Sequence, residues 1–93
     1  MAYNRFNKKY SGNYCGWSSR GTHLTAIAIR NDIGLNTYVL KNKQALLSLP
    51  KEDKLSLIKR NAKSSWAKSD LKEVNTYNVK ASELNQIIRD LGE

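Results

Sequence analysis

Residues 18–35 read SSRGTHLTAIAIRNDIGL, and this stretch decides the fold. The hydroxyls of Ser18 and Ser19 at its start are suited to capping a helix. The apolar-rich segment from Thr22 to Asn31 follows them, and Asp32 stands directly after it. Because aspartate is also a favoured N-cap residue, the stretch predicts two consecutive helices that meet at Asp32.

The segment from Thr22 to Asn31 is too short for its periodicity alone to define its secondary structure. Its alanines and the serine cap favour a buried helix, with Ile27 and the alanines packed inside. Larger side chains at every second position from Thr25 to Ile29 would also fit a strand. We expect the helix and keep the strand as the alternative.

Three further helices are expected downstream, from Ile33 to Leu49, from Pro50 to Lys68 and from Ala81 to Leu91. Proline suits the first turn of a helix, where its missing N–H costs nothing. Residues 69–79 form a connector. Apolar residues recur at three- and four-residue spacing, which is typical of the buried face of a helix. The side chains expected in the core are Leu35, Tyr38, Val39, Leu46, Leu49, Leu55, Ile58, Ala62, Trp66, Leu84, Ile87, Ile88 and Leu91, with Leu71, Val74 and Tyr77 of the connector docked against them.

Residues 1–18 differ in composition from the rest of the chain. Basic and aromatic residues are interspersed there, and no acid is present. Because glycines and small polar residues lie between them, the segment shows no helical periodicity. The sequence therefore predicts a mainly α fold, a small single-domain bundle of about four short helices at residues 19–93, preceded by an irregular basic-aromatic arm at residues 1–18. Trp17 is expected to pack on the core. With 93 residues the core is modest, so a homodimer or a bound partner would add buried area.

The charge balance is the main functional signal. Sixteen Lys and Arg residues against eight Asp and Glu give a formal net charge of +8. A solvated surface explains such an excess, but we favour an electrostatic footprint for nucleic acid or another polyanion. Two groups of cations have no evident partner at helical spacing. The candidate binding residues are Arg5, Lys8, Lys9, Tyr10 and Arg20 in or beside the arm, and Lys59, Arg60 and Lys63 on the outer face of the third helix.

We expect no catalytic residue, metal site, cofactor or small-molecule substrate. Cys15 and His23 are the only tempting nucleophile and base, and nothing places one beside the other. The glycines form no P-loop, since Gly16 is followed by Trp17 where that motif needs lysine. The acids are scattered, mostly at expected helix ends, which is typical of capping and not of a paired-carboxylate site.

A single cysteine excludes an intrachain disulfide and, with one histidine, a zinc site from this chain alone. The free thiol and the absence of an apolar segment near Met1 predict a cytoplasmic protein. The longest apolar run, from Ala26 to Ile29, is far too short to cross a bilayer, so no membrane association is expected.

The segment Tyr14–Thr22, continued through Ile27–Asp32, resembles an uncharacterised family of small phage and plasmid proteins. Members open with Tyr-x-Gly-Trp-Thr/Ser-Asn-Tyr-Glu-Thr-Trp and end on a segment similar to Val79–Leu91. The resemblance covers roughly half of the chain and implies a phage-type origin and a mostly helical fold, but no activity. Gly21 stands where the family has the Glu of a capping box, and His23 replaces its second Trp, so the first helix is expected to be less firmly capped.

These observations predict a small basic phage-type accessory protein that acts by binding, during host takeover. Its partner is expected to be nucleic acid or a host nucleic-acid machine, contacted in the host cytosol. The alternative is a protein-binding inhibitor of a host defence enzyme, of the anti-CRISPR or anti-restriction type, that occupies an acidic protein surface without touching nucleic acid.

Overall fold

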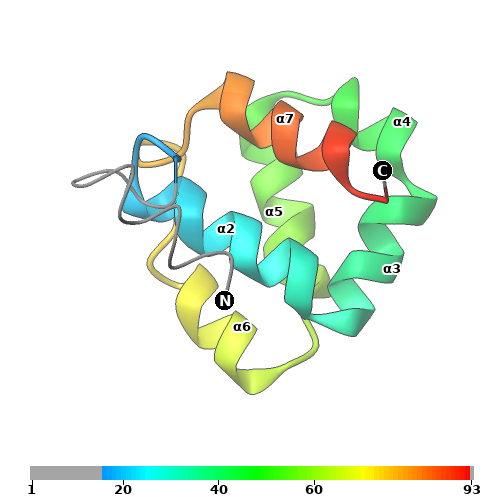
Figure 1. Cartoon of the computed structure of the whole chain (residues 1–93), viewed down its shortest axis with the longest axis horizontal. Helices are drawn as coiled ribbons and strands as arrows, with labels where there is room; N and C mark the ends of the chain where they lie inside the picture. Colours follow the sequence, from blue (N-terminus) through cyan, green and yellow to red (C-terminus); the bar gives the residue numbers. More distant parts are fainter. Residues whose placement is uncertain (1–15, 93) are drawn as a thin grey trace.

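The segment after Ser19 forms a helix and not a strand in the computed structural model, which describes residues 16–92. This helix, α2 (Arg20–Asn31), is capped by Ser19, whose side chain accepts a hydrogen bond from the N–H of Thr22. It contacts α3, α6 and α7, and Figure 1 shows it crossing the middle of the molecule. Its burial on several sides explains its run of small and apolar residues.

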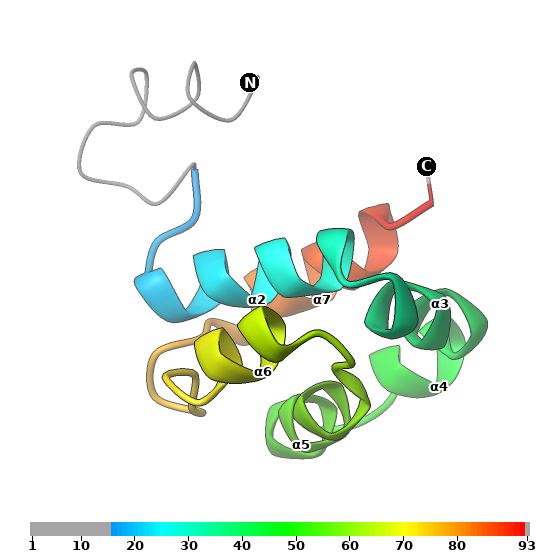
Figure 2. The same ribbon diagram turned by 90° about the horizontal axis from the view of Figure 1, so that it is seen from below.

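The chain continues through α3 (Ile33–Lys41), α4 (Lys43–Leu47), α5 (Lys51–Asn61), α6 (Ser65–Leu71) and α7 (Ala81–Asp90). The expected mainly α fold is confirmed, but residues 16–92 contain six helices where about four were expected. Seen from below, α2 and α7 form one layer and α5 and α6 the other, while α3 and α4 close one end (Figure 2).

The two extra helices arise because two expected helices are each broken once. The second expected helix breaks at Asn42, whose backbone N–H reaches the carbonyls of Tyr38 and Val39 and whose side chain also donates to Tyr38. The third breaks after Asn61, where Ala62 adopts an extended conformation (φ −67°, ψ 137°). Both breaks redirect the chain so that short helices can cover the layers from several sides.

The core follows the predicted pattern with three exceptions. Most of the expected side chains are buried, and Tyr38, Leu49 and Trp17 pack against them partly buried. Ile27, expected inside, is only half-buried. Trp66 is 40% exposed and Tyr77 is 96% exposed, so the prediction that these two rings join the core is wrong. The last helix needs no correction, since Leu84, Ile87 and Ile88 are buried and Gly92 follows with a positive φ of 87°.

Candidate functional site

One buried carboxylate joins two distant turns at a corner of the molecule. Asp32 Oδ1 accepts a hydrogen bond from the N–H of Leu35 at 2.9 Å, which caps α3. Asp32 Oδ2 accepts from the N–H groups of Lys63 and Ser64, each at 2.7 Å. The turn between α5 and α6 is thereby fixed against the turn between α2 and α3.

Burial alone would raise the pKa of the Asp32 carboxyl group. Hydrogen bonds from four backbone N–H groups outweigh that effect and hold the pKa below its ordinary value. The donors are the N–H groups of Leu35, Ser64, Lys63 and Gly34. Asp32 is therefore ionised at neutral pH although its side chain is inaccessible to solvent. The corner is rigid because three of these hydrogen bonds are short and charge-assisted.

Three of the predicted binding residues lie together at this corner. Lys59 and Arg60 occupy the last turn of α5, and Lys63 follows in the turn that Asp32 holds. All three side chains are exposed, and within residues 16–92 none of them forms an ion pair. A side chain at position 34 would overlap the Cγ atom of Lys63, so Gly34 leaves the space in which the Lys63 stem lies.

Two apolar side chains flank these cations. Trp66 comes three residues after Lys63, in the first turn of α6, and Ile33 directly precedes Gly34. Trp66 is 40% exposed and Ile33 is 83% exposed. The sequence missed this feature because it predicted one continuous helix through Trp66. The break at residues 62–64 changes the phase, so that Ala67 and Leu71 face the core instead. We call Ile33, Lys59, Arg60, Lys63 and Trp66 the corner surface.

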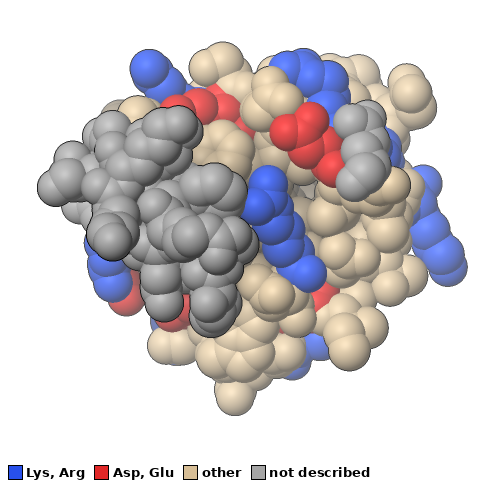
Figure 3. Space-filling view, in the orientation of Figure 1, with Lys and Arg blue, Asp and Glu red and all other residues tan. Residues whose placement is uncertain are grey.

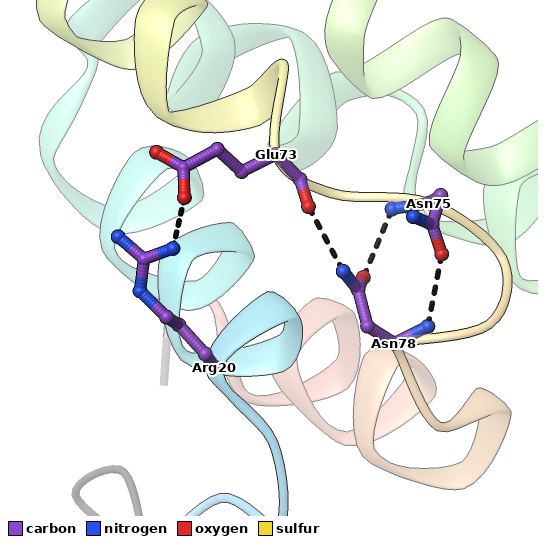
Figure 4. Close-up of polar contacts among 4 residues, drawn as sticks. All are labelled: Arg20, Glu73, Asn75 and Asn78. Carbon is purple, nitrogen blue, oxygen red and sulfur yellow. Dashed lines mark hydrogen bonds and ion pairs between the residues drawn. The ribbon is translucent and has the colours of Figure 1, made fainter.

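Arg20 does not join this surface, because it has an intramolecular partner that is remote in sequence and lies outside helical spacing. Its guanidinium forms an ion pair with Glu73, which lies at the other end of α6 (Figure 4). The pair links the start of α2 to the loop at residues 72–80. The remaining predicted arm residues, Arg5, Lys8, Lys9 and Tyr10, lie outside the described residues.

The loop at residues 72–80 is tightly ordered by two asparagines. Asn75 Oδ1 accepts from the N–H groups of Tyr77 and Asn78, while Asn78 Oδ1 accepts from the N–H of Asn75 and Asn78 Nδ2 donates to the carbonyl of Glu73 (Figure 4). The carbonyl of Asn78 also accepts a hydrogen bond from the Ser19 hydroxyl. Tyr77 therefore projects from a loop whose backbone is held on both sides of it.

Three lysines that the sequence did not single out hold α7 in place. Lys43 Nζ donates to the carbonyls of Arg89 and Leu91, each at 2.8 Å, at the C-terminal end of α7. Lys51 Nζ donates to the carbonyl of Val79, just before α7 begins. Lys54, a buried residue, donates to the side chain of Asn85 in its middle. No local pattern identifies such lysines, because each acts on a segment far away in the sequence.

The remaining charges are dispersed. On the face shown in Figure 3, basic side chains are scattered with neutral and acidic residues between them. Within residues 16–92 no three His, Cys, Asp or Glu side chains gather in a way that could hold a metal ion. None of the helices in that part of the chain is both long and apolar enough to cross a membrane.

The chain matches no family model, no curated protein and no solved structure.

Proposed function

We propose that this protein binds nucleic acid through the corner surface, as a small basic accessory protein of the phage type. The observation that carries the proposal is a half-exposed tryptophan beside three exposed cations that have no acidic partner within residues 16–92. Cations in such a setting neutralise backbone phosphates, and an aromatic ring stacks on an unpaired base.

The rigidity of the corner favours this role. The hydrogen bonds from the Lys63 and Ser64 N–H groups to Asp32 fix the backbone between the α5 cations and Trp66. A ligand that spans these side chains does not have to order the turn when it binds, so less binding energy is lost. Stacking on Trp66 requires an accessible base, which favours single-stranded segments over duplex.

The test compares two variants that lose the same charge. The corner variant combines Lys59→Gln, Arg60→Gln and Lys63→Gln. The control variant combines Lys41→Gln, Lys68→Gln and Arg89→Gln. All six of these side chains are exposed. Binding of labelled single-stranded oligonucleotides is measured by anisotropy over a range of salt concentrations. The corner variant is expected to flatten the dependence of log K on log salt by about 2 units, at about 0.7 unit per phosphate contact. Equal losses of affinity in the two variants would mean that the net charge of the protein, and not the corner surface, determines binding.

Inhibition of a host protein is a second candidate, favoured by one observation on α3. Ile33 and Leu40 are exposed on this helix, at 83% and 42%, and their seven-residue spacing places them on one side of it. Exposed apolar side chains flanked by cations also suit an acidic protein surface. Capture from host lysate with and without nuclease separates the two functions. Nucleic-acid binding predicts partners that disappear with nuclease, whereas inhibition predicts a stoichiometric protein that remains.

A further inference from the structure

Tyr77 is an exposed aromatic residue on a preorganised loop. Its side chain is 96% exposed, so it contributes little to the core. The two asparagines that bracket it satisfy the backbone around it, and Ser19 anchors Asn78 to the start of α2. Because the backbone that carries the ring is already ordered, only the side-chain torsions of Tyr77 lose freedom when a ligand covers the ring.

A shallow pocket of about 300 Å³ adjoins the ring, and Ser19, Lys51, Asn78 and Lys80 are among the residues that line it. Two of these residues bring ammonium groups. Lys51 is positioned by its hydrogen bond to the carbonyl of Val79, and Lys80 is exposed without an ion pair in the described part of the chain.

The nearby acids are already engaged. Glu83 accepts hydrogen bonds from the N–H and the hydroxyl of Ser18, and Glu73 is paired with Arg20. The two lysines outweigh the remaining charge of Glu83, so the pocket favours an anion. An aromatic platform beside ammonium groups matches the base and the phosphate of one nucleotide.

We propose that Tyr77 and the pocket beside it form a second nucleotide-binding site, in which a base stacks on Tyr77 and its phosphate lies between Lys51 and Lys80. The inference rests on the proposed function, since it assigns a second contact to the same single-stranded ligand. The site lies at the C-terminal end of α6, whereas the corner surface lies at its N-terminal end (Figure 1). A strand must therefore be long enough to reach both sites.

The experiment measures binding of single-stranded DNA and RNA oligonucleotides, and of the matching duplex, to four proteins: the unmodified chain, Tyr77→Leu, Tyr77→Phe and the corner variant. Tyr77→Leu is expected to weaken single-strand binding by about 5- to 150-fold, the loss of one stacked base. Tyr77→Phe keeps the ring and is expected to retain affinity. Duplex binding through phosphates is expected to change little in either variant.

Photo-crosslinking adds a readout that a purely structural role would not produce. Oligonucleotides that carry 5-iodouracil are expected to crosslink to the peptide containing Tyr77, and less so after Lys80→Gln. Single-strand affinity unchanged in Tyr77→Leu, with crosslinks confined to the corner surface, would overturn this inference and leave the proposed function intact. An unmodified chain that binds no oligonucleotide would overturn both.

Discussion

Asp32 acts as the N-cap of α3 and as the anchor of the turn before α6. The first role is visible in the sequence, since aspartate before an apolar segment is a common helix start. The second role is not, because Lys63 and Ser64 come about thirty residues later and only the folded chain brings their N–H groups to the same carboxylate.

Replacing Asp32 by Asn tests this double role. The amide keeps its size but has one acceptor oxygen, so at least one of the buried N–H groups loses its partner. We expect Asp32→Asn to lower the free energy of unfolding by about 1–3 kcal/mol at neutral pH, measured by urea denaturation.

The pH dependence follows from the lowered pKa. The folded state favours the ionised carboxylate of Asp32. The carboxylate therefore contributes fully to the free energy of unfolding above the ordinary pKa of 3.8, and this contribution is lost as pH falls through the pKa of the folded state. The stability gap between the unmodified protein and Asp32→Asn is expected to narrow in acid. A gap that stays constant from neutral pH to well below pH 3.8 would contradict this account.

Gly21 lies where the start of α2 meets the loop at residues 72–80. A side chain at this position would overlap both the carbonyl and the amide oxygen of Asn78. Alanine favours a helix over glycine by about 1 kcal/mol, but overpacking against a hydrogen-bonded loop costs typically about 1–3 kcal/mol. We expect Gly21→Ala to be destabilising despite its better helix propensity, with a lower midpoint in thermal unfolding.

Gly21 also lies next to the cap of α2. Ser19 caps the helix, and its hydroxyl lies 2.9 Å from that of Thr22. Gly21 permits the loop at residues 72–80 to pack close to the helix start.

At the scale of elements, α7 is held by lysines from α4 and α5. Lys54 is the most buried of these, at 4% exposure, and burial lowers the pKa of its ammonium group. The folded state thus disfavours the charged form, and the unfolded state binds more protons at alkaline pH. Because the unfolded state takes up more protons, the free energy of unfolding rises as pH increases from the folded pKa of Lys54 toward the ordinary value of 10.5.

Lys54→Met removes this titration while keeping the length of the side chain. Asn85 is only half-buried, so water can replace the lost hydrogen bond. We expect the variant to be within about 1 kcal/mol of the unmodified protein at neutral pH, or more stable, since replacing a buried charge by an apolar group is often neutral or better. As pH rises through the alkaline range, the free energy of unfolding of Lys54→Met is expected to rise less than that of the unmodified protein. Parallel pH profiles for the two proteins would refute this.

At the scale of the whole molecule, the core links the two layers. Ile58 in α5 and Leu84 in α7 are fully buried. Truncating either one to alanine is expected to cost about 2–5 kcal/mol, a large share of a total stability of about 5–15 kcal/mol. The measurement is the urea midpoint, with exposed Ser82→Ala as the control.

Removing cations from the corner surface is expected to change stability in the opposite direction from truncating core residues. Unpaired like charges repel one another in the compact state. The corner variant is therefore expected to have an unchanged or higher thermal midpoint while it loses nucleic-acid affinity. A lower midpoint would show that Lys59, Arg60 or Lys63 stabilises the fold, and the loss of binding would then need another explanation.

The helical class, the cap at Asp32 and the buried face of α7 could all be predicted from the sequence, because they depend on neighbours within a turn or two. The sequence also predicted that Lys59, Arg60 and Lys63 lie in solvent. The positions at which the long helices break are visible only in the tertiary structure, where the turn after Asn61 is held by the Asp32 carboxylate, about thirty residues earlier in the sequence. That break exposes Trp66 beside the three cations.

The tertiary structure likewise distinguished the cations that have an acceptor elsewhere in the fold from those that have none within residues 16–92. Arg20, Lys43, Lys51 and Lys54 find their acceptors on segments remote in sequence. Lysine and arginine side chains carry the same charge whether they face water or a carbonyl group. Their roles are therefore set by which acceptors the folded chain brings within hydrogen-bonding distance, and no local pattern records that.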